Sequence, residues 1–129
     1  MVGLVIVSHS CKIAEGIKDL ALEMARNYTG LHCAAGLEDG TIGTDAVRIM
    51  EAIQAADSGD GVVVLADLGS GIISAETAID MLDGSVKVKI ADAPIVEGSI
   101  IAAVEASIGS DFDKVLAEAE KTREFHKIQ

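Results

Sequence analysis

Short runs of aliphatic residues alternate along this chain with longer stretches that carry apolar side chains at helical spacing. The run VVVLA at residues 62–66 is apolar throughout, and so is the run LVIV at residues 4–7. A strand that is apolar on both faces needs cover on both sides, which helices flanking a parallel sheet provide. The alternation of such strands with helices favours βαβ units and predicts an α/β fold.

The same pattern predicts one doubly wound domain over residues 1–129, with a mainly parallel sheet of four or five strands. Strands are expected at residues 2–8, 31–35, 62–67 and 86–91. The last of these alternates polar and apolar residues, which is typical of a strand at or near a sheet edge. We expect the strand order 2-1-3-4, because this common order for a small unit places the first and third strands side by side.

Apolar residues at helical spacing fill the intervals between the strands. Helices are expected from residue 10 to 27, from a cap at Thr44, from residue 68 to 82, after Pro94 and after a cap at Ser110. Pro94 should lie in the first turn of its helix. The segment at residues 99–109 is apolar around much of its circumference, so it should be buried on more than one side, for which a subunit interface is one explanation. Residues 120–129 are expected to form a frayed tail.

Charge and composition narrow the range of functions. A net charge of −11 without a cluster of Lys and Arg argues against nucleic-acid binding, which requires positive charge to meet the phosphates. No stretch approaches the roughly 20 apolar residues that span a bilayer. The run at residues 2–7 is too short for a secretory signal. With Cys11 and Cys33 as the only cysteines, we expect a cytoplasmic protein with reduced thiols.

The histidine of the Ser-His-Ser triplet at residues 8–10 lies between the first strand and the helix that follows. In an open α/β sheet, ligands bind beyond the carboxyl ends of the strands, where the strand order reverses. His9 ends the first strand and Asp67 ends the third, so their side chains should meet there. A carboxylate on one ring nitrogen would fix the tautomer and leave the other nitrogen nucleophilic. A polar loop residue without chemistry is the alternative for His9.

Groups suited to a phosphoryl group gather at the same edge. Phosphorylated imidazole carries negative charge, and helix N-termini and glycine-rich turns offer backbone N–H groups to such a charge. The predicted phosphate-binding residues are Ser10, Thr41, Gly43, Thr44, Gly69, Ser70 and Gly71. We expect this site to bind no metal ion.

Other chemistries find weaker support in the sequence. No glycine-rich turn is followed by Lys-Ser or Lys-Thr, and the sequence from Gly69 to Gly71 is only a fragment of a dinucleotide fingerprint. No serine beside His9 lies on a Gly-x-Ser-x-Gly elbow. A metal site is the main rival, with His9, Cys11, His32 and Cys33 as ligand types. Consecutive strand residues point to opposite faces, however, so His32 and Cys33 should not both converge on one ion.

Three motifs resemble one bacterial family. VIVSHS at residues 5–10, LADLGSG at residues 65–71 and APIVEGSIIAAVEAS at residues 93–107 resemble the phosphocarrier subunits of phosphoenolpyruvate-dependent dihydroxyacetone kinases. Those subunits are similar in fold to the mannose-type EIIA domains of the sugar phosphotransferase system. The resemblance extends from Val2 to about Glu120, and the three motifs in this order make it specific.

The resemblance implies a phosphoryl carrier. His9 would accept a phosphoryl group, on Nε2, from the histidine-containing phosphocarrier protein and pass it to ADP on the nucleotide-binding subunit of the kinase. Asp67 matches the aspartate that pairs with the active histidine. The resemblance also implies a homodimer. It implies no tightly bound cofactor, because ADP, ATP and Mg²⁺ belong to the partner subunit. Some relatives carry further phosphotransfer domains after this one, so the chain is expected to depend on a separate donor.

Two other functions stay open. LADLGSG lacks the Phe-Gly-Gly-Ser-Pro segment typical of mannose EIIA proteins, which favours the kinase subunit over a mannose-type sugar-transport component. The glycine-rich loops alone would also suit a module that binds a nucleotide or small molecule without covalent chemistry. Binding of free nucleotides would separate this module from a carrier.

Overall fold

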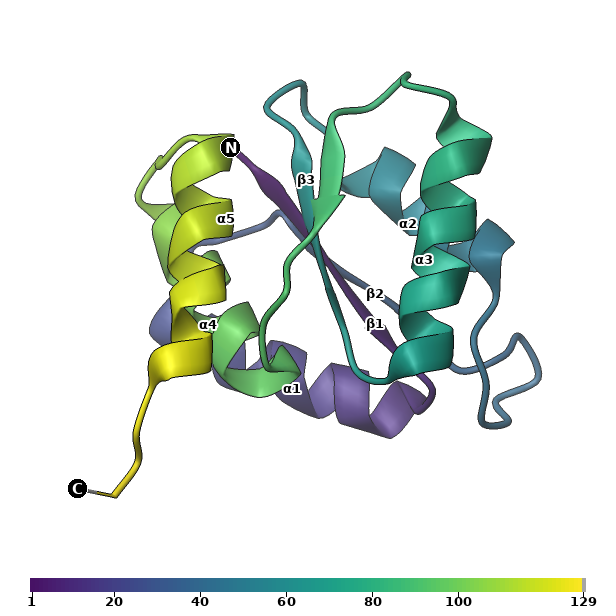
Figure 1. Cartoon of the computed structure of the whole chain (residues 1–129), viewed down its shortest axis with the longest axis horizontal. Coiled ribbons are helices and arrows are strands. Elements are labelled where there is room, and N and C mark those ends of the chain that lie inside the picture. The colour runs from purple at the N-terminus through teal and green to yellow at the C-terminus, as the bar shows by residue number, and fades with distance from the viewer. Residues whose placement is uncertain (129) are drawn as a thin grey trace.

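The computed structural model of the chain describes residues 1–128 and contains a four-stranded, fully parallel sheet (Figure 1). The strands are β1 (Gly3–Ser8), β2 (Leu31–Ala35), β3 (Val62–Ala66) and β4 (Val88–Ile90), in the order β2-β1-β3-β4. The predicted α/β class and strand order are therefore confirmed. β4 lies at a sheet edge, as its alternating sequence predicts.

Helices cover both faces of the sheet. They are α1 (Cys11–Met24), α2 (Ala46–Ala56), α3 (Gly69–Leu82), α4 (Ile95–Ser107) and α5 (Phe112–Lys121), followed by a 3₁₀ turn at Thr122–Glu124. Helices α1, α4 and α5 cover one face, and α2 and α3 cover the other (Figure 1). In residues 1–128, none of the helices has the length and apolar character that a membrane crossing requires.

Strand β3 is apolar throughout, and β1 is apolar up to Ser8, because each face of the sheet has its own core. Leu4 and Ile6 of β1 pack toward α1 and α4, whereas Val5 and Val7 pack toward α2 and α3. All four side chains are completely buried. The period of two along a strand thus sends successive aliphatic residues into two separate cores.

The apolar segment at residues 99–109 is explained largely by α4, which packs against the sheet and lies between α1 and α5. Its buried residues are small, namely Gly98, Ser99, Ala102, Ala103 and Ala106. Small side chains allow a helix to approach its neighbours closely, and the prediction of burial on more than one side is confirmed. The packing within one chain accounts for this burial without a second subunit.

Three predicted helix starts are wrong by one residue. Asp45, not Thr44, caps α2 by accepting a hydrogen bond from the amide of Val47 at 2.9 Å. Asp111, not Ser110, caps α5 in the same way. Pro94 is itself the N-cap of α4 and does not lie in its first turn. Aspartate caps a helix as well as serine or threonine does, so the local sequence does not separate adjacent candidates.

The end of the first helix and the C-terminal tail also differ from the predictions. The first helix ends at Met24, not at residue 27, and the chain turns so that the Tyr28 hydroxyl donates to the carbonyl of Val2. Residues 120–124, expected to fray, are helical, and Thr122 is buried. Arg123 pairs with Asp92 at 2.7 Å, so a tertiary contact holds this turn. Gln129 lies outside the described residues.

Substitution of Gly3 should destabilise the fold. A Cβ at Gly3 would lie 2.2 Å from the carbonyl oxygen of Ala56, so α2 must shift to admit it. We expect Gly3→Ala to lower the free energy of unfolding by about 2–3 kcal/mol, as overpacking does. Gly16→Ala in α1 meets no atom within 4 Å and should instead raise it by about 0.5–1 kcal/mol. Urea unfolding measures both, and equal stability of the two variants would contradict this packing.

Candidate functional site

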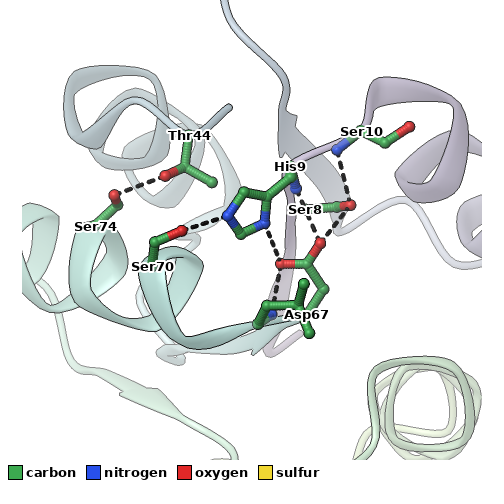
Figure 2. Close-up of polar contacts among 8 residues, drawn as sticks. Ser8, His9, Ser10, Thr44, Asp67, Ser70 and Ser74 are labelled. Atoms are coloured by element: carbon green, nitrogen blue, oxygen red, sulfur yellow. Dashed lines mark hydrogen bonds and ion pairs between the residues drawn. The ribbon is translucent and has the colours of Figure 1, made fainter. Parts of the chain in front are cut away.

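The candidate site lies at the carboxyl edge of the sheet, where β1 and β3 end side by side (Figure 2). Val7 of β1 is in register with Ala66 of β3, and the next residues in the chain take the two strands out of the sheet. The amide of Asp67 donates to the carbonyl of Val7 at 3.1 Å. The predicted meeting of His9 and Asp67 at this edge follows from that register.

The Asp67 carboxylate is held by four donors. Oδ1 lies 2.9 Å from Nδ1 of His9 and accepts a hydrogen bond from the amide of Leu68 at 2.7 Å. Oδ2 accepts hydrogen bonds from the His9 amide at 3.0 Å and from the Ser8 hydroxyl at 2.9 Å. Each oxygen therefore has two donors, which fixes the orientation of the carboxylate against the imidazole.

The ionisation of the Asp67 carboxyl determines which ring nitrogen of His9 has the lone pair. Burial raises the pKa of the Asp67 carboxyl, but hydrogen bonds from the His9 and Leu68 amides, the Ser8 hydroxyl and the His9 ring outweigh it and hold the pKa below its ordinary value. An ionised carboxylate only accepts hydrogen bonds, so Nδ1 of His9 must donate. The lone pair of the neutral ring is then on Nε2.

Nε2 of His9 faces the hydroxyl of Ser70, which donates to it (Figure 2). Ser70 lies in the first turn of α3, one residue after Gly69. The amides of Gly69 and Ser70 donate to no acceptor within residues 1–128. A helix N-terminus with free N–H groups is favourable for an anion. Nε2 therefore lies beside donors that suit a negatively charged group.

Some of the other predicted phosphate-binding residues are hydrogen-bonded to His9 or to α3, and others are not. The amide of Gly43 donates to the carbonyl of His9 at 2.9 Å, and the Thr44 hydroxyl bonds to that of Ser74 at 2.8 Å, so this loop is tied to both the histidine and α3. The Ser10 hydroxyl caps α1. The Thr41 hydroxyl is exposed and donates to Asp39. These residues stay predictions as phosphate ligands.

Two residues outside the predicted set belong to this arrangement. The Ser8 hydroxyl is completely buried, donates to Asp67 and accepts a hydrogen bond from the Ser10 amide at 3.1 Å. It is the one polar side chain in the otherwise apolar strand β1, which is a signal that the sequence offers. Ser74 is one turn beyond Ser70 on α3, and only the fold brings it to Thr44.

His32 and Cys33, the rival metal ligands, lie on β2 away from His9. The Cys33 thiol points toward α1 and donates to the carbonyl of Ala14. Burial raises the pKa of this thiol to about 11, and burial also lowers the pKa of His32. Within residues 1–128 no three side chains of His, Cys, Asp or Glu are grouped so that they would hold a metal ion.

Gly71 is a sensitive position because of its closeness to the pair. A Cβ there would lie 3.0 Å from Oδ1 of Asp67 and 3.7 Å from Cε1 of His9. The carboxylate is held by four donors and cannot move without weakening them. We expect Gly71→Ala to slow chemistry at His9 about tenfold, because small displacements of reacting groups are costly.

The control is Gly16→Ala in α1, outside the candidate site, where an added Cβ meets no atom within 4 Å. It should react with His9-directed reagents at the wild-type rate. Rates are measured as the incorporation of a phosphoryl group from phosphoramidate, followed by intact-mass spectrometry. Equal rates for the two variants would show that the site tolerates the Cβ at Gly71.

Solved structures share this fold. An EIIA component of the phosphotransferase system from Streptococcus agalactiae superposes with a TM-score of 0.71 over 96% of this chain and 93% of that one, at 16% identity. A crystal structure of a protein of unknown function superposes with a TM-score of 0.81 at 35% identity, over 93% of both chains. The fold is that of an EIIA-type domain of the phosphotransferase system. The chain belongs to the EIIA-man family, described as PTS system fructose IIA component, whose pattern matches residues 3–116.

The names of the curated relatives describe one function. The "PEP-dependent dihydroxyacetone kinase, phosphoryl donor subunit DhaM" of Klebsiella michiganensis is 43% identical over 134 residues, and that of Escherichia coli is 45% identical over 124 residues. These alignments cover 100% and 92% of this chain but only 28% and 26% of the relatives. The Listeria innocua subunit of kinase 2 is 37% identical, with 92% of this chain and 96% of the relative covered.

Proposed function

We propose that this chain is the phosphoryl-donor subunit of a dihydroxyacetone kinase and carries the phosphoryl group on Nε2 of His9. In the first step, the Nε2 lone pair forms a bond to phosphorus while the N–P bond of a histidine-containing phosphocarrier protein breaks. In the second step, a β-phosphate oxygen of ADP on the nucleotide-binding subunit attacks the same phosphorus. The N–P bond to His9 breaks, and ATP forms.

The observation that carries this proposal is the hydrogen bond of Asp67 to Nδ1 of His9, at 2.9 Å. It keeps the proton on Nδ1 and leaves Nε2 as a nucleophile. When Nε2 becomes bonded to phosphorus, the carboxylate stabilises the positive charge that develops on the ring. When the phosphoryl group leaves, the neutral imidazole is restored without the transfer of a proton.

The start of α3 supports the phosphorylated form. The Ser70 hydroxyl now donates to Nε2, and a rotation about its χ1 would direct that donor to an oxygen of a phosphoryl group bound there. The free amides of Gly69 and Ser70 and the N-terminal end of the helix dipole add further stabilisation. Binding of the equatorial oxygens by preorganised donors is the main contribution that a protein makes to phosphoryl transfer.

We propose that the chain itself holds no resident cofactor. Mg²⁺ would be bound with the nucleotide on the acceptor subunit and would offset the negative charge of its phosphates. The names of the relatives support the kinase and the donor role, and the His9–Asp67 geometry supports the chemistry. A mannose-type sugar-transport component would use the same histidine, so only the identity of the acceptor separates the two functions.

The direct test is phosphorylation of the purified chain. It is incubated with phosphoenolpyruvate, the general phosphotransferase enzyme and the phosphocarrier protein, and its mass is then measured. We expect a gain of one phosphoryl group that is lost in acid, is stable in base and maps to His9. Transfer onward to ADP, but not to a sugar-transport acceptor, identifies the kinase role. No gain in mass with a charged donor would contradict the proposal.

We further propose that the chain forms a homodimer through the outward side of α1. Ile13, Leu20 and Met24 are 52%, 47% and 66% exposed and share one side of that helix, at spacings of seven and four residues. Sedimentation should give twice the 13.3 kDa chain mass. The double variant Leu20→Lys, Met24→Lys should sediment as a monomer, whereas Met81→Lys on α3 should remain dimeric. A monomeric wild-type chain would contradict this arrangement.

A further inference from the structure

A groove lies beside the histidine site, on the β4 side of Asp67. It has a volume of about 470 Å³ and is lined by the ends of β3 and β4 and by one side of α3. Ile72 and Ile90 form apolar parts of its wall, and Asp67 lines it as well. The groove is therefore continuous with the residue that holds His9, and it opens at the edge of the sheet from which His9 is reached.

The groove is acidic. Asp67, Glu76 and Asp92 line it, and no lysine or arginine among residues 1–128 does. The oxygens of Asp67 are occupied by their four donors, and Asp92 pairs with Arg123 at 2.7 Å. Glu76 forms no ion pair or hydrogen bond through its side chain within residues 1–128. A carboxylate without a cation therefore faces the groove from α3.

Exposed aliphatic side chains border the histidine site and the groove. We define the apolar rim as Ile42, Leu68, Ile72 and Ile73. Leu68 and Ile73 are 66% and 64% exposed, and Ile42 is 70% exposed. Each rim residue is close in the chain to a member of the pair or to a residue that contacts it. Ile42 precedes Gly43, Leu68 follows Asp67, and Ile72 and Ile73 are two and three residues beyond Ser70 on α3. Isolated exposed aliphatic residues are ordinary, but four around one reactive group indicate an interaction surface.

We propose that the groove and the apolar rim dock the protein that takes the phosphoryl group from His9, and that the groove receives a lysine or arginine side chain flanked by apolar residues on that protein. The inference rests on the proposed function. A cation with an aliphatic stem fits a groove with apolar walls and an unpaired carboxylate. Aliphatic residues around that cation would cover the rim.

The phosphorylated state favours the acceptor over the donor as the occupant. The phosphoryl group on Nε2 itself carries about one and a half to two negative charges. The positive charge on the ring offsets part of this, so phosphorylation still adds net negative charge next to an already acidic groove. A basic protein therefore binds the phosphorylated chain more tightly than the unphosphorylated one. After transfer the extra charge is gone and the acceptor dissociates more readily. The donor meets the chain before this charge exists, so it gains less from the groove.

The experiment compares Glu76→Lys and Ile73→Ser with controls at the opposite edge of the sheet. The controls are Asp113→Lys at the start of α5 and Ile108→Ser after α4, both on exposed residues. Each variant is first phosphorylated with phosphoramidate, which requires no protein docking. Single-turnover transfer to the nucleotide-binding subunit loaded with ADP and Mg²⁺ is then followed at increasing concentrations of that subunit. Phosphorylation by the donor protein is measured in parallel.

We expect Glu76→Lys and Ile73→Ser to lower the second-order rate constant for transfer to the acceptor at least tenfold. The controls should stay within twofold of wild type, and phosphoramidate labelling should be unchanged in all variants. For the wild type, transfer should slow with added salt, and this dependence should be weaker in Glu76→Lys because steering by opposite charges is screened.

Three results would overturn the inference. The first is transfer at the control rate in both test variants. The second is slow phosphoramidate labelling in them, which would place the damage at His9. The third is an equal loss in the donor step, which would show that the groove does not prefer the acceptor. Failure of phosphoramidate to label wild-type His9 would instead contradict the proposed function, so the two failures are distinguishable.

Discussion

His9→Ala is expected to abolish phosphoryl acceptance while leaving the fold intact. The substitution removes Nε2, the nucleophile of the proposed reaction, and leaves no second imidazole at this edge of the sheet. His32 is on β2, and His126 follows the 3₁₀ turn near the C-terminus. The loss should therefore be complete within the sensitivity of mass spectrometry after incubation with the charged donor.

The stability of His9→Ala should change little. The His9 side chain is 23% exposed, and Asp67 keeps three of its four donors when the ring is removed. Loss of one hydrogen bond lowers the free energy of unfolding by about 1 kcal/mol. Circular dichroism and urea unfolding check this. His126→Ala is the matched control and should accept a full phosphoryl group. Stoichiometric labelling of His9→Ala would show that another residue is phosphorylated.

The sequence was sufficient to predict the pairing of His9 with Asp67 because that pairing follows from topology. Continuous aliphatic runs indicate buried parallel strands, and the order 2-1-3-4 makes β1 and β3 neighbours. The residues after the two strands must then meet at one edge of the sheet, and this does not depend on the conformations of the loops. No contact had to be predicted individually.

The loops and caps could not be predicted in the same way. Thr44 and Asp45 are both good helix caps, and the choice depends on Ser74, which is 30 residues away and binds the Thr44 hydroxyl. The helical turn at residues 122–124 likewise depends on the pairing of Arg123 with Asp92. Local sequence contains neither partner. The hydrogen bonds of Ser8 and Ser70 at the site have the same origin in the tertiary fold.

Asp67→Asn should slow the phosphorylation of His9 by about two to four orders of magnitude, as loss of a correctly held catalytic imidazole does in other enzymes. The carboxylate accepts two hydrogen bonds on each oxygen. An asparagine keeps one oxygen and replaces the other with an NH₂ group that only donates. Two of the four donors must therefore face another donor in either orientation of the amide.

The pH dependence of stability separates the charge of Asp67 from its shape. Hydrogen bonds lower the pKa of Asp67 in the folded state despite its burial, so the ionised carboxylate stabilises the fold above its unfolded pKa of about 3.9. This contribution disappears as the pH falls through the lower folded pKa. Urea unfolding should show the wild type more stable than Asp67→Asn at pH 7, with the difference shrinking toward pH 3. A constant difference would mean that the charge contributes nothing.

Nitrogen-15 NMR of His9 provides the measurement that links Asp67 to the chemistry. In the wild type, Nδ1 should carry the proton and Nε2 should show the shift of a nitrogen with a free lone pair. In Asp67→Asn, an NH₂ group facing Nδ1 favours the opposite tautomer, with the proton on Nε2, where it blocks attack on phosphorus. Ser70→Ala is the control, because it removes the contact to Nε2 and keeps the Asp67 hydrogen bond. If Asp67→Asn reacted slowly with an unchanged tautomer, the role of the carboxylate would be to stabilise the phosphorylated ring and not to select the nitrogen.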